Sequence, residues 1–183
     1  MQGQFDTASV APAVTPGIPL VCVMGVSAAG KSTVGAALAD ALGLPFVDAD
    51  DLHSSAHRAK MAAGTPLSDL DRWPWLDAVG ERFAAHRRTG LVTACSALRR
   101  AYRDRIRAVE PGVVFVHLDG SRQLLADRAG ARADHFMPAA LLDSQFATLE
   151  PLAADEPGLV ADVSAPAEEL VADIAARLRQ SLR

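Results

Sequence analysis

The segment Gly25-Val-Ser-Ala-Ala-Gly-Lys-Ser32 carries the most specific chemical signal in the chain. It fits the pattern GxxxxGK[ST] at every fixed position, between a strand-like apolar run and a helix-like stretch. The two glycines let the backbone turn and approach an anion closely, so that successive N–H groups face phosphate oxygens. A chance glycine turn is the alternative, and the agreement of pattern and context disfavours it. A GxGxxG dinucleotide loop fits neither the spacing nor the lysine.

This loop is therefore expected to bind ATP. Lys31 should reach the β- and γ-phosphates, and the Ser32 hydroxyl should ligate Mg²⁺. The residues expected to contact the nucleotide are Gly25, Val26, Ser27, Ala28, Ala29, Gly30, Lys31, Ser32 and Thr33.

Two carboxylates, Asp48 and Asp50, end the next apolar run. Alternate residues of a strand face the same way, so both side chains can point at one site. One would support the magnesium shell, and the other would take the proton from an attacking hydroxyl. An ordinary polar strand end or helix cap explains the same residues about equally well.

The elements that must position these residues alternate along the chain. The sequence predicts strands at residues 20–24, 45–48, 91–95, 113–118 and 159–163. It predicts helices at residues 32–42, 51–63, 74–88 (with Pro74 in the first turn), 97–108, 122–129, 139–149 and 167–182. Short apolar strands alternating with helices are typical of an α/β fold, here a parallel sheet of about five strands with helices on both faces. Ligands bind such sheets at the carboxyl ends of the strands.

Composition bounds the remaining possibilities. The chain has 183 residues, a net charge of −4 and a pI of about 5.7, which argues against a nucleic-acid binder. We expect one domain at residues 20–183 after a disordered tail at residues 1–19. No apolar run has the length of a membrane span, and no signal peptide is visible. The two cysteines predict buried thiols and a cytoplasmic protein.

Beyond the loop, the chain resembles the gluconokinase family of P-loop small-molecule kinases, over residues 20–166. The segments that carry the resemblance are Asp50-Asp-Leu-His53, Lys60-Met61, Asp71-Arg72, Pro74-Trp75-Leu76, Cys95-Ser-Ala-Leu98, Tyr102-Arg103-Asp104, His135-Phe136, Gln145-Phe146 and Thr148-Leu-Glu150. The sequence departs from the family pattern at Ser54, His57, Arg99 and the Ala-Ala pair of the loop. Ser54 and His57 leave the shape of the acceptor pocket open.

The resemblance implies a P-loop kinase fold related to shikimate kinase and transfer of phosphate from ATP to D-gluconate. It also implies a homodimer. By the resemblance, Asp50 holds and deprotonates the acceptor hydroxyl, and Asp48 supports Mg²⁺. A lid at about residues 129–138 would bring Arg128 and Arg132 to the transferred phosphoryl group.

Gluconate is a polyol with a carboxylate, so its site needs guanidinium groups and hydrogen-bonding side chains. Arg72 is the carboxylate candidate, although a salt bridge to Asp69 or Asp71 explains it equally well. The predicted substrate-binding residues are Asp50, His53, Arg72, Ser96, Arg103 and His135. Two other functions remain open: a kinase acting on shikimate or another sugar acid, and a nucleotide-binding regulator without catalysis.

Overall fold

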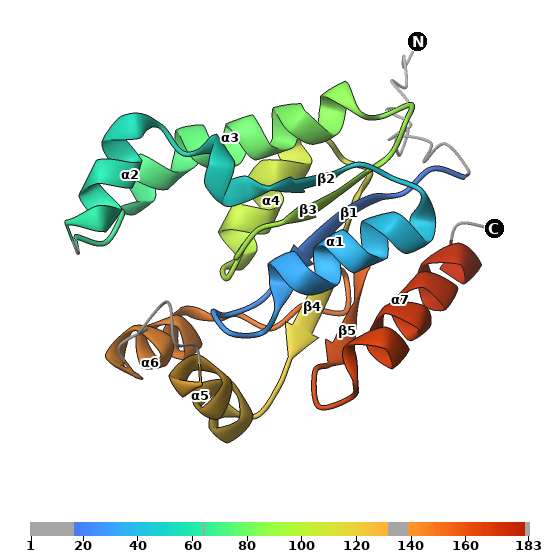
Figure 1. Cartoon of the computed structure of the whole chain (residues 1–183). Coiled ribbons are helices and arrows are strands. Elements are labelled where there is room, and N and C mark those ends of the chain that lie inside the picture. Colours follow the sequence, from blue (N-terminus) through green and yellow to red (C-terminus); the bar gives the residue numbers. More distant parts are fainter. Residues whose placement is uncertain (1–16, 64, 132–138, 182–183) are drawn as a thin grey trace, which may run out of the picture.

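A five-stranded parallel sheet forms the centre of the molecule (Figure 1). The structure, a computed structural model, describes residues 17–63, 65–131 and 139–181. The strand order is β2-β3-β1-β4-β5. The strands are β1 (Leu20–Met24), β2 (Phe46–Asp48), β3 (Leu91–Ala94), β4 (Val113–Asp119) and β5 (Gly158–Asp162). The predicted α/β fold with a parallel sheet is confirmed.

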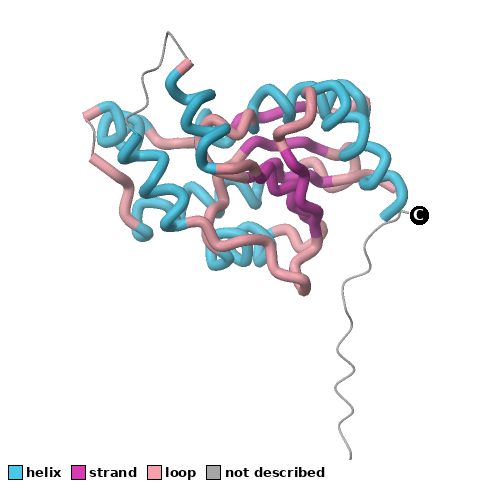
Figure 2. The backbone as a smooth tube through the Cα atoms, turned by 90° about the horizontal axis from the view of Figure 1, so that it is seen from below, coloured by secondary structure: helices cyan, strands magenta, loops and turns pink. Residues whose placement is uncertain are grey.

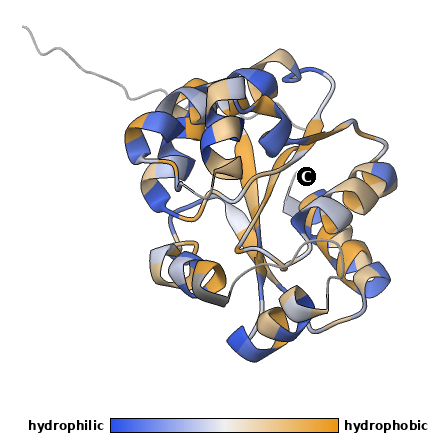
Figure 3. Ribbon diagram, turned by 60° about the vertical axis from the view of Figure 1, so that its left-hand side comes forward, coloured by the Kyte–Doolittle hydropathy of each residue, from blue (hydrophilic) through white to orange (hydrophobic). Residues whose placement is uncertain are grey.

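Helices cover both faces of this sheet, so the central strands read as continuous apolar runs. All five residues of β1 are buried, with β3 and β4 paired to it on either side. The tube in Figure 2 shows the strands running between helices, and Figure 3 shows the strands mainly in the hydrophobic colour. The helices are α1 (Lys31–Leu42), α2 (Ser55–Ala62), α3 (Asp69–Ala85), α4 (Arg100–Val109), α5 (Arg122–Gly130), α6 (Ala139–Thr148) and α7 (Ala167–Ser181), with a 3-10 turn η1 (Ala49–Leu52).

The sheet separates two hydrophobic cores. On one face, α1 and α7 pack through side chains such as Leu38 and Ile174. On the other face, α3 and α4 contribute Phe83 and Ile106. Both cysteines are buried and free, as predicted. No helix in the described ranges has the length and apolarity to cross a membrane.

Local caps decide two of the helix boundaries that differ from the predictions. The helix expected from Pro74 begins five residues earlier, since Ser68 and Asp71 form a capping box that satisfies N–H groups of the first turn. Pro74 therefore lies inside α3. The single helix expected at residues 51–63 is divided into η1 and α2, because Ser54 adopts an extended conformation and caps α2 with its hydroxyl.

Two further predictions fall largely on residues outside the described ranges. The structure does not describe residues 1–16 of the expected tail, nor residues 132–138 of the expected lid. The part of the lid segment that is described, up to residue 131, is the end of α5 and one turn residue.

The packing of α3 on α4 depends on the missing side chain at Gly80. A Cβ atom built there would lie 2.7 Å from Val109 Cβ and 3.1 Å from the Ile106 carbonyl oxygen. We expect Gly80→Ala to force the helices apart and to lower the free energy of unfolding by about 1–3 kcal/mol. Urea denaturation measures this loss.

The control is Gly130→Ala at the end of α5, where an added Cβ meets nothing within 4 Å. This variant should keep or slightly raise stability, by up to about 1 kcal/mol, because alanine restricts the unfolded chain. A Gly80→Ala protein as stable as the control would contradict the packing argument.

Candidate functional site: a phosphate-binding loop and an acceptor cleft

The predicted phosphate loop leaves β1, the central strand, and enters α1 at Gly30. Gly25 has φ 142°, and a Cβ built on it would lie 2.8 Å from the Leu118 carbonyl oxygen. Gly30 has φ 89° and precedes the first turn of α1. Gly25 needs to be glycine because of both its positive φ and the close carbonyl, and Gly30 because of its positive φ. The N-terminus of α1 then lies at the end of the loop, where the helix dipole stabilises an anion.

Neighbouring segments hold this loop in place. The Gly25 N–H donates to the Ser96 carbonyl after β3 at 3.3 Å. The Ser27 N–H donates to the side-chain oxygen of Gln145 on α6 at 2.6 Å. Lys31 Nζ donates to the Val26 carbonyl at 3.0 Å, so the lysine side chain lies over the loop.

Ser32 and Asp48 provide two oxygen ligands side by side. The Ser32 hydroxyl donates to Asp48 Oδ2 at 2.5 Å, and Asp48 Oδ1 accepts the Asp50 N–H at 3.0 Å. Hydroxyl and carboxylate oxygens beside a phosphate loop fit Mg²⁺, which keeps several waters and nucleotide oxygens. The described residues contain no cluster of three or more His, Cys, Asp or Glu that would hold a metal alone. Phosphate oxygens of a bound nucleotide would complete the coordination of such an ion.

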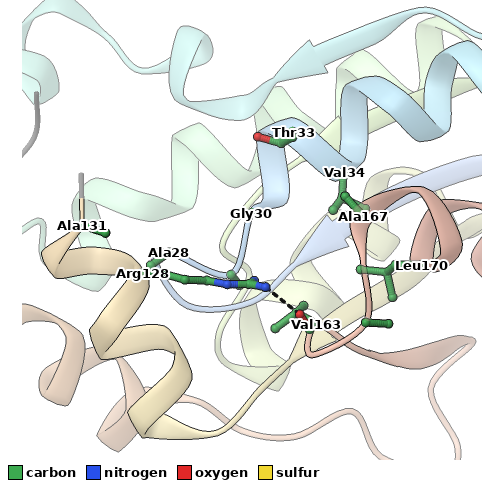
Figure 4. Close-up of a pocket in the computed structure, with 11 residues that line it drawn as sticks. Ala28, Gly30, Thr33, Val34, Arg128, Ala131, Val163, Ala167 and Leu170 are labelled. Carbon is green, nitrogen blue, oxygen red and sulfur yellow. Dashed lines mark hydrogen bonds between the residues drawn. The ribbon is translucent and has the colours of Figure 1, made fainter. Parts of the chain in front are cut away.

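A pocket of about 350 Å³ lies between the phosphate loop, Arg128 of α5 and the segment that joins β5 to α7 (Figure 4). Its walls are mostly small and apolar, with Val34 and Leu170 opposite the loop residues Ala28 and Gly30. Arg128 lies at the pocket and donates to the Val163 carbonyl at 2.8 Å, as the dashed line shows. This space, continuous with the phosphate loop, fits a nucleoside.

Asp50 lies beside Asp48, with 86% of its side chain exposed. Desolvation by the protein around it and the nearby Asp48 carboxylate raise the pKa of Asp50, while Lys31 acts in the opposite direction. A carboxylate with a raised pKa is a stronger base than an ordinary aspartate, and this one is open to a second substrate.

Comparisons with known proteins agree with this geometry. A family model described as "AAA domain" matches residues 20–152. A gluconokinase of Gluconobacter oxydans is 49% identical over 139 residues, which cover 74% of this chain and 77% of that protein. A probable gluconokinase of Xenopus tropicalis is 41% identical, covering 85% and 90%. The crystal structure of a gluconokinase from Sinorhizobium meliloti 1021 is 46% identical with a TM-score of 0.82, covering 90% of this chain and 95% of that one.

The chain belongs to the gluconokinase family. The resemblance inferred from its motifs is thereby confirmed. As in other P-loop kinases, this gluconokinase-family chain has its phosphate loop at the carboxyl edge of the sheet. The acceptor side of the cleft follows β2 and β3 at the same edge.

His53 is buried on this acceptor side. Its ring stacks on Trp75 with centroids 4.3 Å apart, and its Nε2 lies 3.9 Å from Asp50 Oδ1. Burial, followed by the nearby His57, Arg58 and Arg72, lowers the pKa of His53 to about 4, so the ring is neutral at pH 7. Its Nδ1 is buried and has no hydrogen-bond partner within the described residues. A neutral imidazole here can give or accept a hydrogen bond from a ligand.

Arg72 makes the salt bridge that the sequence left open as an alternative. Its Nη1 lies 3.6 Å from Asp69 Oδ1. Arg99 contacts the other Asp69 oxygen at 3.0 Å, and the Tyr102 hydroxyl donates to Asp69 at 2.5 Å. The hydrogen bond from Tyr102 and the two guanidinium groups lower the pKa of Asp69. Two cations thus share one anion, and the cluster keeps a net positive charge. Arg99 was missed as a candidate, although its place just after β3 pointed to this edge.

Arg103 lies elsewhere, which argues against the prediction that it binds substrate. Its side chain is fully buried and donates to both carboxylate oxygens of Glu156. It also donates to the carbonyls of Ala97, Leu98 and Glu150. With its donors used inside the protein, the guanidinium stabilises the fold and is not presented to the cleft.

Of the remaining predicted site residues, the structure describes Ser96 but not Arg132 or His135. Ser96 follows β3 beside the phosphate loop, and its carbonyl accepts the Gly25 N–H. Arg132 and His135 lie outside the described residues. Gln145 was not predicted as a site residue; the only sequence signal for it was the family motif.

The pKa of His53 predicts a pH effect on stability. In the unfolded chain a histidine binds a proton near pH 6.5, whereas in the folded protein His53 binds it only near pH 4. Between these values the unfolded state holds more protons, so the free energy of unfolding falls as the pH drops through this window. The variant His53→Phe keeps a ring against Trp75 but does not titrate. Urea denaturation at pH 7 and pH 5 should show a smaller fall for the variant; an equal fall would contradict the assignment.

Proposed function

We propose that this protein is a gluconokinase that transfers the γ-phosphoryl group of ATP to the 6-hydroxyl of D-gluconate. The products are ADP and 6-phospho-D-gluconate. The observation that carries the proposal is the arrangement of the cleft: the phosphate loop and the Ser32–Asp48 pair lie beside the accessible carboxylate of Asp50. Curated relatives that are 41–49% identical are named gluconokinases or probable gluconokinases.

The nucleotide side supplies positioning and charge. The loop amides and the α1 N-terminus would hold the phosphates, with Lys31 extending to the β- and γ-phosphates. Ser32 and Asp48 would hold Mg²⁺, which neutralises charge on the phosphate oxygens. The pocket beside Arg128 would take the nucleoside.

Asp50 would act as the general base. Its carboxylate accepts the proton of the 6-hydroxyl as that oxygen forms a bond to the γ-phosphorus. The bond between the γ-phosphorus and the bridging oxygen breaks, and ADP leaves with the electron pair. Its carboxylate is exposed and lies beside Asp48, so an acceptor hydroxyl can reach it, as a general base requires.

The acceptor side offers groups that match a sugar acid. Arg72 and Arg99, held by Asp69, would bind the carboxylate of gluconate through charge-assisted hydrogen bonds. His53, whose buried Nδ1 has no hydrogen-bond partner in the part of the chain that the structure describes, would hydrogen-bond a hydroxyl. Ser96 is a further candidate at the adjacent strand end.

Other assignments are proposals that rest on the family resemblance. Arg128 and Arg132 would stabilise the transferred phosphoryl group, with His135 near the substrate. Arg128 contacts the Val163 carbonyl in this structure and would have to turn toward the phosphates. A homodimer and a cytoplasmic location are likewise proposed.

The function is tested by a coupled ADP-release assay with Mg²⁺-ATP and a panel of acceptors: gluconate, related sugar acids, glucose and shikimate. We expect selective turnover with gluconate that depends on Mg²⁺. Turnover with another acceptor would support kinase activity but replace gluconate as the assigned substrate. ATP binding without turnover on the whole panel would support a nucleotide-binding regulator.

The role of Asp50 predicts a specific kinetic defect. The variant Asp50→Asn keeps the shape of the side chain but cannot accept the hydroxyl proton. We expect kcat to fall by about 10²–10⁴-fold, with the KM for ATP little changed, because the base acts on the chemical step. Steady-state kinetics measures both values. Near-normal kcat would remove Asp50 from the mechanism.

A further inference from the structure

The phosphate loop has one long-range support that neither the motif nor the proposed chemistry explains. The Ser27 N–H, inside the loop, donates to Gln145 Oε1 of α6 at 2.6 Å, across 118 positions of sequence. Gln145 is only partly exposed, so this hydrogen bond is partly shielded from water.

The residue next to this contact has an unfavourable backbone. Ala28 has φ 64°, in the left-handed region that residues with a Cβ atom rarely adopt. Such a conformation persists only where the surroundings enforce it. Ala28 is nearly buried and lines the nucleotide pocket, so its conformation sets where the following loop amides point.

The other hydrogen bonds of the loop hold its ends or come from the loop itself, as does the 3.0 Å bond from Lys31 Nζ to the Val26 carbonyl. Gly25 is tied to Ser96 at the start, and Gly30 enters α1 at the end. The turn contact from the Ala29 N–H to the Val26 carbonyl is longer, at 3.4 Å. Within the described residues, Gln145 makes the one side-chain hydrogen bond to the loop middle that comes from a distant element.

Helix α6 is itself anchored, so Gln145 can transmit a constraint. Just beyond α6, the Glu150 N–H donates to the Leu98 carbonyl at 2.8 Å, and its carboxylate accepts the Arg100 N–H at 2.6 Å. Leu142 on the same helix is buried in the core. The end of α6 is therefore fixed to the loop after β3, which also holds Gly25 through Ser96.

We propose that Gln145 is a positioning residue for ATP: it holds the Ser27 N–H and thereby keeps Ala28 in the left-handed conformation that the phosphate loop needs. The inference rests on the proposed function only in that ATP binds this loop; it does not depend on the acceptor. The amide is suited to the task because it accepts a hydrogen bond without adding negative charge beside the phosphates.

The test is a double-mutant cycle on ATP binding. Gln145→Met keeps the length of the side chain but removes the acceptor, so Ala28 can relax. We expect the Kd of a non-hydrolysable ATP analogue and the KM for ATP to rise about tenfold, the effect of one lost hydrogen bond, with the KM for gluconate within about twofold. Gln145→Glu should also weaken binding, because it retains an acceptor but repels phosphate.

The variant Ala28→Gly tests whether Gln145 acts by holding the backbone strain at Ala28 rather than by stabilising the structure in general. Glycine adopts positive φ without a steric penalty, so the loop should depend less on Gln145 in this background. We expect Gln145→Met to raise the Kd by less than about threefold when combined with Ala28→Gly. Gln123→Met is the matched control, since Gln123 is exposed on α5 and donates a hydrogen bond to Asp127 on the same helix; it should leave the Kd unchanged.

Three results would overturn the inference: an unchanged Kd in Gln145→Met, an equal loss with and without Ala28→Gly, or an equal rise in both KM values. Titration calorimetry with the analogue needs no acceptor, so it separates this inference from the substrate assignment. A wild-type protein that binds ATP but does not phosphorylate gluconate would leave the inference standing and refute the proposed function.

Discussion

The structure depends on one constraint: a short loop must keep several backbone N–H groups directed at one small volume. Such a loop cannot be stabilised by its own contacts alone, because its polar groups are reserved for a ligand. The fold solves this by placing the loop at the end of the central strand. The ends of β3 and β4 then flank it, through the Ser96 carbonyl on one side and Leu118 on the other. A fully buried β1 fixes where the loop begins.

Charged side chains of different sign gather at different places along the same edge of the sheet. The nucleotide side combines Lys31 with the two carboxylates Asp48 and Asp50. Desolvation, followed by the nearby Asp48 carboxylate, raises the pKa of Asp50, and Lys31 opposes this rise. The acceptor side carries an excess of guanidinium groups around Asp69. Between them lies His53, kept neutral by burial against Trp75. A negatively charged acceptor would thus meet positive charge at one end and a base at the other.

Arg103 shows why an arginine at the right sequence position need not bind a ligand. A buried guanidinium is costly to desolvate unless its donors are satisfied. Here Glu156 and several backbone carbonyls satisfy them, and these acceptors come from the loop after β3 and from the segment after α6. The ion pair therefore joins the loop after β3, which contains Ser96, to the segment after α6.

The sequence by itself determined the fold class, the position of every strand to within a residue or two, and the residues of the phosphate loop. These follow from local signals: apolar runs, glycine spacing and the order of strands and helices. Helix starts were less certain, because side-chain caps at Ser68 and Ser54 decided them. Which arginine is buried, which histidine is neutral and which distant side chain supports Ser27 were decided only by the tertiary structure. Burial and electrostatic environment depend on neighbours such as Glu156, Trp75 and Gln145, which lie far away along the chain and become neighbours only after folding.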